Sequence, residues 1–423
     1  MRIFKATSLV TMGAIAASLP LASAQEDFFA RDRHTSVQER QQPEFDPEPI
    51  RLGGLLLDSS IAAGISSNDN VFAQPTGEES DILITLNPTA QLRTNWSIHE
   101  LSAGLDLQVR KYNDFDIEDA TDIRANVGGR LDVTREITLS GRVYANEIYE
   151  TRRAITSQQG LDGPIEYDVL GTQLEAQFQR SRISARATLT LDNIDYIDGS
   201  LLSNGLVVDQ DFRDNVARRL QTRVSYALSP DVAIFGQAEV GSRDYDTTFD
   251  GLGNEVNRDS TTYAAQGGVN FELPSLFRGD IAVGYLKDKK DGIGFGDVSG
   301  LAIDGRLEWF PTELTTLTLD ASRRSADPGL LASPSAINTS FGVRADHELR
   351  RNIVLYGRVG RTSTDFEDFA REDEVANLGF GGIYKMSKHV HIDAFYDYFN
   401  RDSDFAPDEF SQNLLGIRLR FFP

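Results

Sequence analysis

The chain has 423 residues, of which 40% are hydrophobic and 25% charged, with no cysteine and a net charge of −22. This composition is too polar for a helical membrane protein and too apolar for a disordered chain, and the lack of cysteine excludes disulfides and thiolate metal sites. Acidic residues outnumber basic ones by 64 to 42, so the chain repels phosphate backbones and we expect no nucleic-acid binding.

Residues 1–24 have the pattern of a signal peptide. The basic start MRIFK precedes an apolar run from Ala6 to Leu21, and the sequence Ala22-Ser23-Ala24 provides a small-residue cleavage site. A membrane anchor helix is the alternative, but the apolar run is shorter than the ~20 residues that span a bilayer. We therefore expect an exported protein that begins at Gln25 after cleavage.

Residues 25–51 are rich in charged residues, glutamine and proline, and they have no sustained period. This composition predicts a flexible periplasmic leader. From residue 52 to residue 423 the pattern changes to a regular alternation, which we interpret as one further domain.

The alternation has a period of two residues. In residues 101–109 (LSAGLDLQV) the odd positions are apolar and the even positions are small or polar, and residues 137–145 (ITLSGRVYA) and 183–192 (ISARATLTLD) repeat this arrangement. A helical period of 3.6 would mix the two sets. The pattern therefore predicts β-strands along nearly the whole domain.

The connections between these strands fall into two length classes. Short turns such as residues 229–231 (SPD) alternate with long acidic loops such as residues 196–214, and counting both kinds gives about 18 antiparallel strands, with 16 as the alternative. A soluble β-sandwich or propeller has shorter strands and no such division of its connections. The sequence thus predicts an all-β, up-and-down transmembrane barrel, with short periplasmic turns and long extracellular loops.

The last segment, residues 413–423 (NLLGIRLRFFP), supports this prediction. Its strand would place Leu415, Ile417, Leu419 and Phe421 on one apolar face, which as an open edge would promote aggregation. In a closed barrel this strand pairs with the segment at residues 52–65 and its apolar face meets lipid. The segment also resembles the C-terminal signal of the barrel-assembly machinery, although Pro423 follows the final aromatic residue.

If the apolar parity faces lipid, the other parity faces the lumen. The predicted lumen-lining residues are Arg110, Arg124, Arg130, Arg142, Arg186, Arg223, Arg306, Arg344, Arg358, Arg418, Asp106, Asp192, Asp304, Glu308, Asp346 and Asp393. One interpretation is a hydrated channel, since 16–18-stranded barrels leave an aqueous lumen. The other is that opposite charges pair across strands and stiffen the wall. Three long polar loops, residues 150–166, 196–214 and 245–260, are candidates for inward-folded constrictions.

The sequence gives little sign of catalysis or of a cofactor, so we expect neither an enzyme nor a metal site. All histidines of the predicted barrel lie near its short turns, away from the outer rim. His389 and His391 share a strand face and could bind a metal, but a polar strand start is the simpler interpretation. The acidic loops at residues 114–119 and 192–199 lack the spacing of an EF-hand. We interpret them instead as solvated loops that bind divalent cations loosely and bridge lipopolysaccharide phosphates.

Several segments resemble the outer-membrane β-barrel porin family of type 2. They are SNDNVFA (67–73), GRLDVTREITLSG (129–141), RGDIAVGYL (278–286), PTELTTLTLDASR (311–323) and DHELRRNIVLYGRVG (346–360). The resemblance extends over nearly all of the chain after the leader. It implies a bacterial outer-membrane barrel linked to exopolysaccharide export loci, and it implies no catalytic residues.

These observations together predict a porin-like channel in the outer membrane of a Gram-negative bacterium, for polar solutes and with secreted polysaccharide as one candidate. The alternative is a structural barrel that serves as the outer partner of an exopolysaccharide export complex without open-channel activity. The expected partners are outer-membrane lipid, lipopolysaccharide and the barrel-assembly machinery. The oligomeric state stays open.

Overall fold

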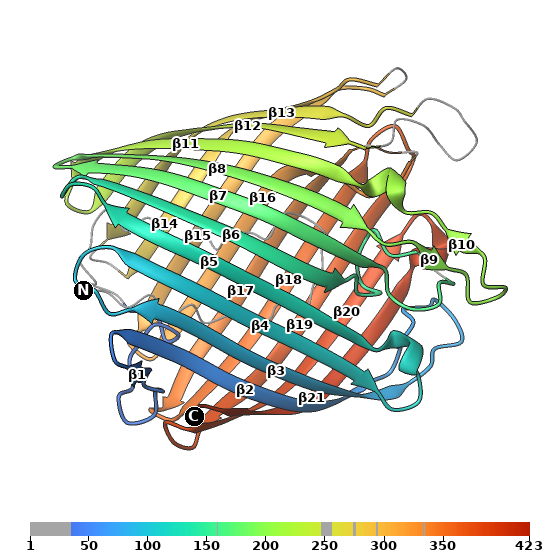
Figure 1. Cartoon of the computed structure of the whole chain (residues 1–423), viewed down its shortest axis with the longest axis horizontal. Coiled ribbons are helices and arrows are strands. Elements are labelled where there is room, and N and C mark those ends of the chain that lie inside the picture. The colour runs from blue at the N-terminus through green and yellow to red at the C-terminus, as the bar shows by residue number, and fades with distance from the viewer. Residues whose placement is uncertain are drawn as a thin grey trace.

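The computed structural model describes residues 35–423 except for residues 159, 247–255, 274–275, 293–294, 332 and 334. The predicted signal peptide lies outside the described residues. Nearly all of the described chain forms one closed antiparallel β-barrel (Figure 1). Within these residues, no helix has the length and apolar character needed to cross a membrane.

Eighteen long strands form the barrel wall, and this confirms the predicted fold and strand number. They are β2 (Leu55–Asn68), β3 (Asp81–Thr94), β4 (Glu100–Tyr112), β5 (Ala120–Asp132), β6 (Ile137–Tyr149), β7 (Glu166–Arg180), β8 (Ile183–Tyr196), β11 (Asn215–Ser229), β12 (Val232–Tyr245), β13 (Ser260–Leu273), β14 (Phe277–Lys290), β15 (Val298–Thr312), β16 (Thr315–Ala326), β17 (Ala336–Arg350), β18 (Ile353–Phe366), β19 (Glu372–Lys385), β20 (Val390–Ser403) and β21 (Phe410–Phe421).

The shorter elements lie at the two ends of this wall. They are strands β1 (Ile50–Leu52), β9 (Gly199–Ser200) and β10 (Val207–Val208), and the 3-10 helices η1 (Asp116–Glu118), η2 (Asp211–Arg213) and η3 (Ala406–Asp408). Strands β9 and β10 form a small hairpin in one of the long loops.

The barrel closes between its first and last long strands. Strand β21 pairs antiparallel with β2 from Ile61 opposite Phe421 to Asn68 opposite Leu414. Beyond the end of β21, the short strand β1 pairs with the beginning of β2, with Ile50 opposite Leu57. The C-terminal strand therefore has a partner on both sides, and β1 covers part of the β2 edge that β21 leaves free.

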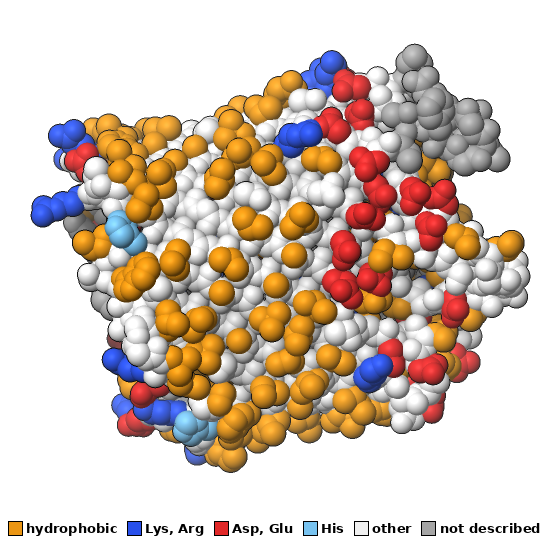
Figure 2. Space-filling view, viewed as in Figure 1, with side chains coloured by type: hydrophobic (Ala, Val, Ile, Leu, Met, Phe, Trp, Pro, Cys, Tyr) orange, Lys and Arg blue, Asp and Glu red, His pale blue; other side chains and the backbone are white. Residues whose placement is uncertain are grey.

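The outer face of the wall is apolar, as membrane insertion requires. In β21, Leu415, Ile417, Leu419 and Phe421 are 62%, 56%, 46% and 45% exposed. Figure 2 shows hydrophobic side chains spread across the wall, with acidic side chains gathered at the end that carries the long loops. This surface fits a hydrocarbon layer around the middle of the barrel, with water and headgroups at its ends.

The short turns at the other end are tight. The turn between β7 and β8 contains only Ser181 and Arg182, and Ser181 has a positive φ of 53°. Two-residue hairpins need such left-handed backbone to match the twist of the flanking strands. The long loops at the opposite end contain the elements η1, β9, β10, η2 and η3.

Candidate channel lumen and its two ends

The predicted lumen-lining residues lie on the parity of their strands that faces away from lipid. They alternate along the wall with outward apolar residues such as Leu105, Val143, Leu355 and Ile417, all of which are exposed on the outer surface. The inner wall therefore carries ionised side chains from most of the strands. What these side chains do depends on how they pair.

On β4 and β5 the charges pair directly. The Arg110 guanidinium lies 2.9 Å from an Asp122 carboxylate oxygen, and both side chains are buried. Arg124 lies 3.1 Å from the other oxygen of Asp122 and 3.6 Å from Asp106. Asp122 thus joins two arginines, and it was not among the predicted lumen residues.

Two arginines face each other across β8 and β11. Arg186 and Arg223 are register partners, an arrangement in which like charges repel. Each turns toward a carboxylate on its other side: Arg186 lies 3.7 Å from Glu175, and Arg223 makes a bidentate pair with Asp280, with one nitrogen–oxygen distance of 3.1 Å. Carboxylates on β7 and β14 therefore offset the repulsion.

The same solution recurs on the far side of the barrel. Arg344 and Arg358 are register partners on β17 and β18. Arg344 lies 2.8 Å from Asp346 on its own strand, and Arg358 lies 2.7 Å from Asp397 on β20. One of these ion pairs therefore lies within a single strand, and the other joins β18 to β20 across β19.

Most of the other predicted lumen residues also have partners. These contacts join Arg130 to Asp132 at 3.3 Å, Arg306 to Glu308 at 3.5 Å, Asp393 to the Tyr356 hydroxyl at 3.1 Å, Asp304 to Arg324, Glu308 to Arg278, and Asp192 to the Tyr144 hydroxyl. The wall is therefore largely a lattice of charge pairs.

Arg142 and Arg418 are different. Arg142 donates to the Gln173 amide oxygen at 3.4 Å and lies over the Tyr144 ring, and Arg418 lies over the Phe395 ring with its guanidinium carbon 5.3 Å from the ring centroid. Among the described residues, no carboxylate oxygen lies within 4.0 Å of either guanidinium. The positive charge of these two arginines is therefore not neutralised by a direct ion pair within the described residues.

At the outer end, the loop between β6 and β7 folds inward. Arg152 pairs with Glu118 of η1 at 3.1 Å, and Arg153 donates to the Gln412 side chain on β21. The Arg153 carbonyl accepts a hydrogen bond from Arg401 on β20. Since β20 and β21 lie several strands away from β6 and β7 around the barrel, residues 150–165 extend across part of the mouth.

A buried ion pair holds the base of this inward loop. Arg213 of η2 is 2% exposed and bonds both carboxylate oxygens of Glu150, one of them at 3.3 Å. The Arg213 guanidinium also lies 3.8 Å from the centroid of the Tyr196 ring, and Thr156 donates to Glu150. Residues 196–214 therefore support the inward loop through η2.

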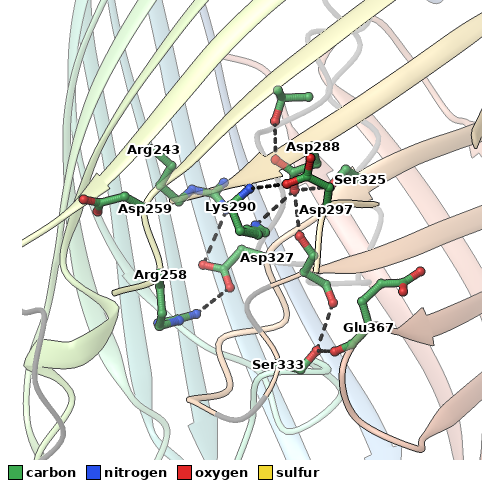
Figure 3. A network of polar contacts seen from close by, with 12 residues as sticks. Arg243, Arg258, Asp259, Asp288, Lys290, Asp297, Ser325, Asp327, Ser333 and Glu367 are labelled. Atoms are coloured by element: carbon green, nitrogen blue, oxygen red, sulfur yellow. Dashed lines mark hydrogen bonds and ion pairs between the residues drawn. The ribbon is translucent and has the colours of Figure 1, made fainter. Parts of the chain in front are cut away.

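A second polar network joins the loops between β12 and β13 and between β16 and β17 (Figure 3). Asp327 accepts from Arg258 at 2.7 Å and from the Tyr245 hydroxyl at 2.5 Å, and it lies 3.5 Å from Arg243. Burial raises the pKa of Asp327, but Arg258 and Arg243 outweigh it and hold the pKa well below the usual range. Asp327 therefore stays ionised and fixes these loops together.

At the turn end, residues 35–49 of the predicted leader lie against the inner wall. Ser36 and Val37 are buried, and the Val37 amide donates to Thr316 on β16 at 3.0 Å. Gln38 donates to Asp346 on β17 at 2.9 Å. The composition predicted a flexible leader and gave no sign of these contacts with the barrel wall.

Ion pairs hold the leader along this wall. Arg40 lies 3.2 Å from Glu348 on β17, and Glu39 lies 2.9 Å from Arg278 on β14. Further along, Asp46 lies 2.9 Å from Lys385 on β19. The leader therefore contacts strands from β14 to β20 and covers part of the periplasmic opening.

The histidines considered for a metal bind main-chain carbonyls. A ring nitrogen of His389 lies 2.9 Å from the Phe422 carbonyl, and one of His391 lies 2.9 Å from the Phe45 carbonyl of the leader. Among the described residues, two groups of carboxylates have oxygens close enough to share a cation: Glu147, Glu166 and Asp168, and Asp198, Asp209 and Asp211. Acidic groups at a protein surface are common without an ion.

Arg152, Arg153, Arg213 and Arg258 were not among the predicted site residues. All four lie in loops, where no alternation shows the direction of a side chain. Their only signal was the position of the three long polar loops that were named as possible constrictions.

The closed barrel, its apolar outer face and its charged inner face define a porin-like protein of the outer membrane. Residues 42–421 match the family described as putative beta-barrel porin 2, and the chain belongs to that family. The resemblance seen in the sequence is thereby confirmed. This family and fold point to a channel rather than an enzyme.

Solved structures with a similar barrel include OccK2 (OpdF) of Pseudomonas aeruginosa, in complex with glucuronate, at 11% identity and a TM-score of 0.48, covering 86% of this chain and 98% of that one. OpdK of Pseudomonas aeruginosa, with vanillate, is 10% identical with a TM-score of 0.46, covering 87% and 99%. A BenF-like porin of Pseudomonas fluorescens is 10% identical with a TM-score of 0.47, covering 87% and 99%. No curated protein sequence matches the chain.

Proposed function

We propose that the protein is a passive outer-membrane channel for small polar solutes. The observation that carries this proposal is the inner wall, where ionised side chains from most of the strands surround the lumen of a closed 18-strand barrel. An interior of this size holds water and lets polar solutes diffuse. Arg142 and Arg418, which have no carboxylate partner among the described residues, would favour anionic over cationic solutes.

Two elements would control passage. The inward loop at residues 150–165 narrows the outer mouth, and residues 35–49 cover part of the periplasmic opening. Both are held by polar contacts, which can exchange with water. We propose that the leader moves aside when the channel conducts, and that the inward loop stays in place as the constriction.

This arrangement favours small solutes over a polymer. The family's link to exopolysaccharide export suggests a polysaccharide chain as the alternative solute. Passage of such a chain would require the inward loop and residues 35–49 to leave the lumen together. The buried Arg213–Glu150 pair at the base of the inward loop opposes such a movement, because separating it leaves two buried charges without partners.

A structural barrel is the second candidate function. The inward loop and residues 35–49 each cover part of one end of the barrel, and this supports a structural role because a barrel that does not conduct needs no open lumen. In that case the protein would serve as the outer partner of an export complex, and residues 35–49 would be available to bind a periplasmic component.

Electrical recording from the refolded protein in planar bilayers separates the two functions. A channel gives stable current steps, whose size falls when polar solutes small enough to enter the lumen are added but not when the added solutes are too large to enter. A structural barrel stays silent, both as the full chain and after removal of residues 35–49.

A further inference from the structure

The inward loop carries a guanidinium that is close to the wall and has no acidic partner. Arg153 donates from Nε to the Gln412 amide oxygen, and its guanidinium carbon lies 5.1 Å from the centroid of the Phe399 ring. Within the described part of the chain, no carboxylate oxygen lies within 4.0 Å of this guanidinium. Burial lowers the pKa of Arg153 to about 10, so the side chain remains charged at neutral pH.

Aromatic rings support this cation. Phe399 stacks on Phe410 with 5.3 Å between the ring centroids, and Arg401 lies over the other ring of the pair at 5.2 Å. Arg401 is 2% exposed, its Nε has no hydrogen-bond partner, and its terminal nitrogen donates to the Arg153 carbonyl. Cation–π contacts stabilise both arginines, but they do not neutralise the charge. Neither guanidinium therefore has a direct acidic partner among the described residues. Asp397 and Asp69 act on Arg153, and Asp373 and Asp408 act on Arg401, only through longer-range attraction.

Most of the acidic residues nearby pair with other arginines. They form the pairs Glu118 with Arg152, Glu150 with Arg213, and Asp373 and Asp408 with Arg371. These pairs show that the loops at this end usually provide a carboxylate for each buried arginine. Arg401, which is buried, and Arg153, which is partly buried, have no such carboxylate. A cation removed from water in this way is costly unless an anion joins it.

A cavity opens beside Arg153. It has a volume of about 60 Å³ and lies between the inward loop and the wall, with Asn68, Tyr112 and Gln412 among its polar lining residues. This space suits a small planar group and not a whole sugar ring. Glu118 and Glu150 also line it, and although both are paired, they would repel a doubly charged anion more than a singly charged one.

We propose that Arg153, held by Phe399 and Gln412 and reinforced by Arg401, binds the carboxylate group of an acidic solute at the outer constriction. The planar guanidinium can receive a carboxylate through two parallel hydrogen bonds, a geometry that lysine does not offer. This site rests on the proposed channel function, and it adds a solute class, monovalent carboxylates, together with the residue that selects them.

The test measures gluconate, with the uncharged sorbitol as the matched solute. Isothermal titration of the refolded protein in detergent gives the affinity without any need for conductance, and planar bilayers give the block of current. The variant Arg153→Gln is expected to weaken gluconate binding by about tenfold or more, as the loss of a charge-assisted hydrogen bond implies. Arg153→Lys is expected to recover only part of the affinity.

Arg130→Gln is the control, because it removes one positive charge from the lumen at an arginine that already pairs with Asp132. Gluconate binding should be unchanged in this variant, and sorbitol should not bind to any of the proteins. Equal affinity of the wild type and Arg153→Gln for gluconate, or no gluconate binding by the wild type, overturns the site. Normal gluconate binding by a protein that never conducts would instead refute the channel and leave the site standing.

Discussion

Residues 35–49 should control the opening of the channel, and charge neutralisation tests this most cleanly. The triple variant Glu39→Gln, Arg40→Gln and Asp46→Asn removes the leader's side of three ion pairs, whose nitrogen–oxygen distances are 2.9, 3.2 and 2.9 Å. On the wall, Arg278 still has an acidic partner in this variant, because it also pairs with Glu308.

The size of the effect follows from these contacts. Each pair is partly exposed, so about 1 kcal/mol per pair is a reasonable value, and the three together give about 3 kcal/mol. A change of this size shifts the ratio of docked to undocked leader by about a hundredfold. In planar bilayers at ~0.1 M KCl, the variant should therefore be open for a much larger fraction of the time than the wild type.

Salt and a disulfide provide the controls. The difference between the two proteins should shrink in ~1 M KCl, where the screening length falls to ~3 Å. The chain has no cysteine, so Val37→Cys with Thr316→Cys introduces a single possible crosslink at a position where the two residues are in contact. Oxidation should reduce the open fraction, and reduction should restore it. Identical open fractions for the wild type and the triple variant at low salt would refute this account of the leader.

Three other perturbations test the loops and the wall. Arg213→Gln leaves Glu150 buried without its partner, so the inward loop should become sensitive to protease. The double variant Arg213→Gln with Glu150→Gln leaves no buried charge unpaired and should be much less sensitive. Equal cleavage of the inward loop in the two variants would count against this ion pair as the anchor. Burial, together with Asp195, Asp211 and Asp246, raises the pKa of Asp214 to about 6, so the stability of the folded protein should fall as pH rises from about 4 to 6. The variant Asp214→Asn should therefore raise the thermal midpoint at pH 8 but not at pH 3. A higher midpoint at both pH values would contradict this assignment. Ile417→Arg places a charge against lipid at a cost of up to ~2–4 kcal/mol, so it should lower the yield of folded barrel seen on gels. Gln221→Arg places the same charge beside Glu239 in the lumen and should not lower this yield. Equal yields of the two variants would contradict the assigned faces.

The wall of the barrel could be predicted because its information is local. Ile417 and Arg418 are neighbours with opposite surroundings, and a period of two residues is enough to assign one to lipid and the other to the lumen. The alternation of short turns with long loops predicted the strand number in the same way, because the length of each connection can be counted in the sequence.

The two ends of the barrel could not be predicted, because their contacts are distant in the sequence. Gln38 and Asp346 are 308 residues apart, and Arg153 and Gln412 are 259 residues apart. A charged, proline-containing segment has the same composition whether it is solvated or bound to a charged wall. Arg153 of the inward loop contacts Phe399 on β20 and Gln412 on β21, and these two strands come close to the loop only when the barrel closes.

The central claim is that this barrel conducts, and single-channel recording of the refolded full chain tests it most directly. The account predicts discrete, stable openings, which become more frequent when residues 35–49 are deleted and which are blocked by gluconate more strongly than by sorbitol. Bilayers that stay silent with both the full chain and the deletion variant, although the barrel is folded and inserted, would contradict it and favour the structural barrel.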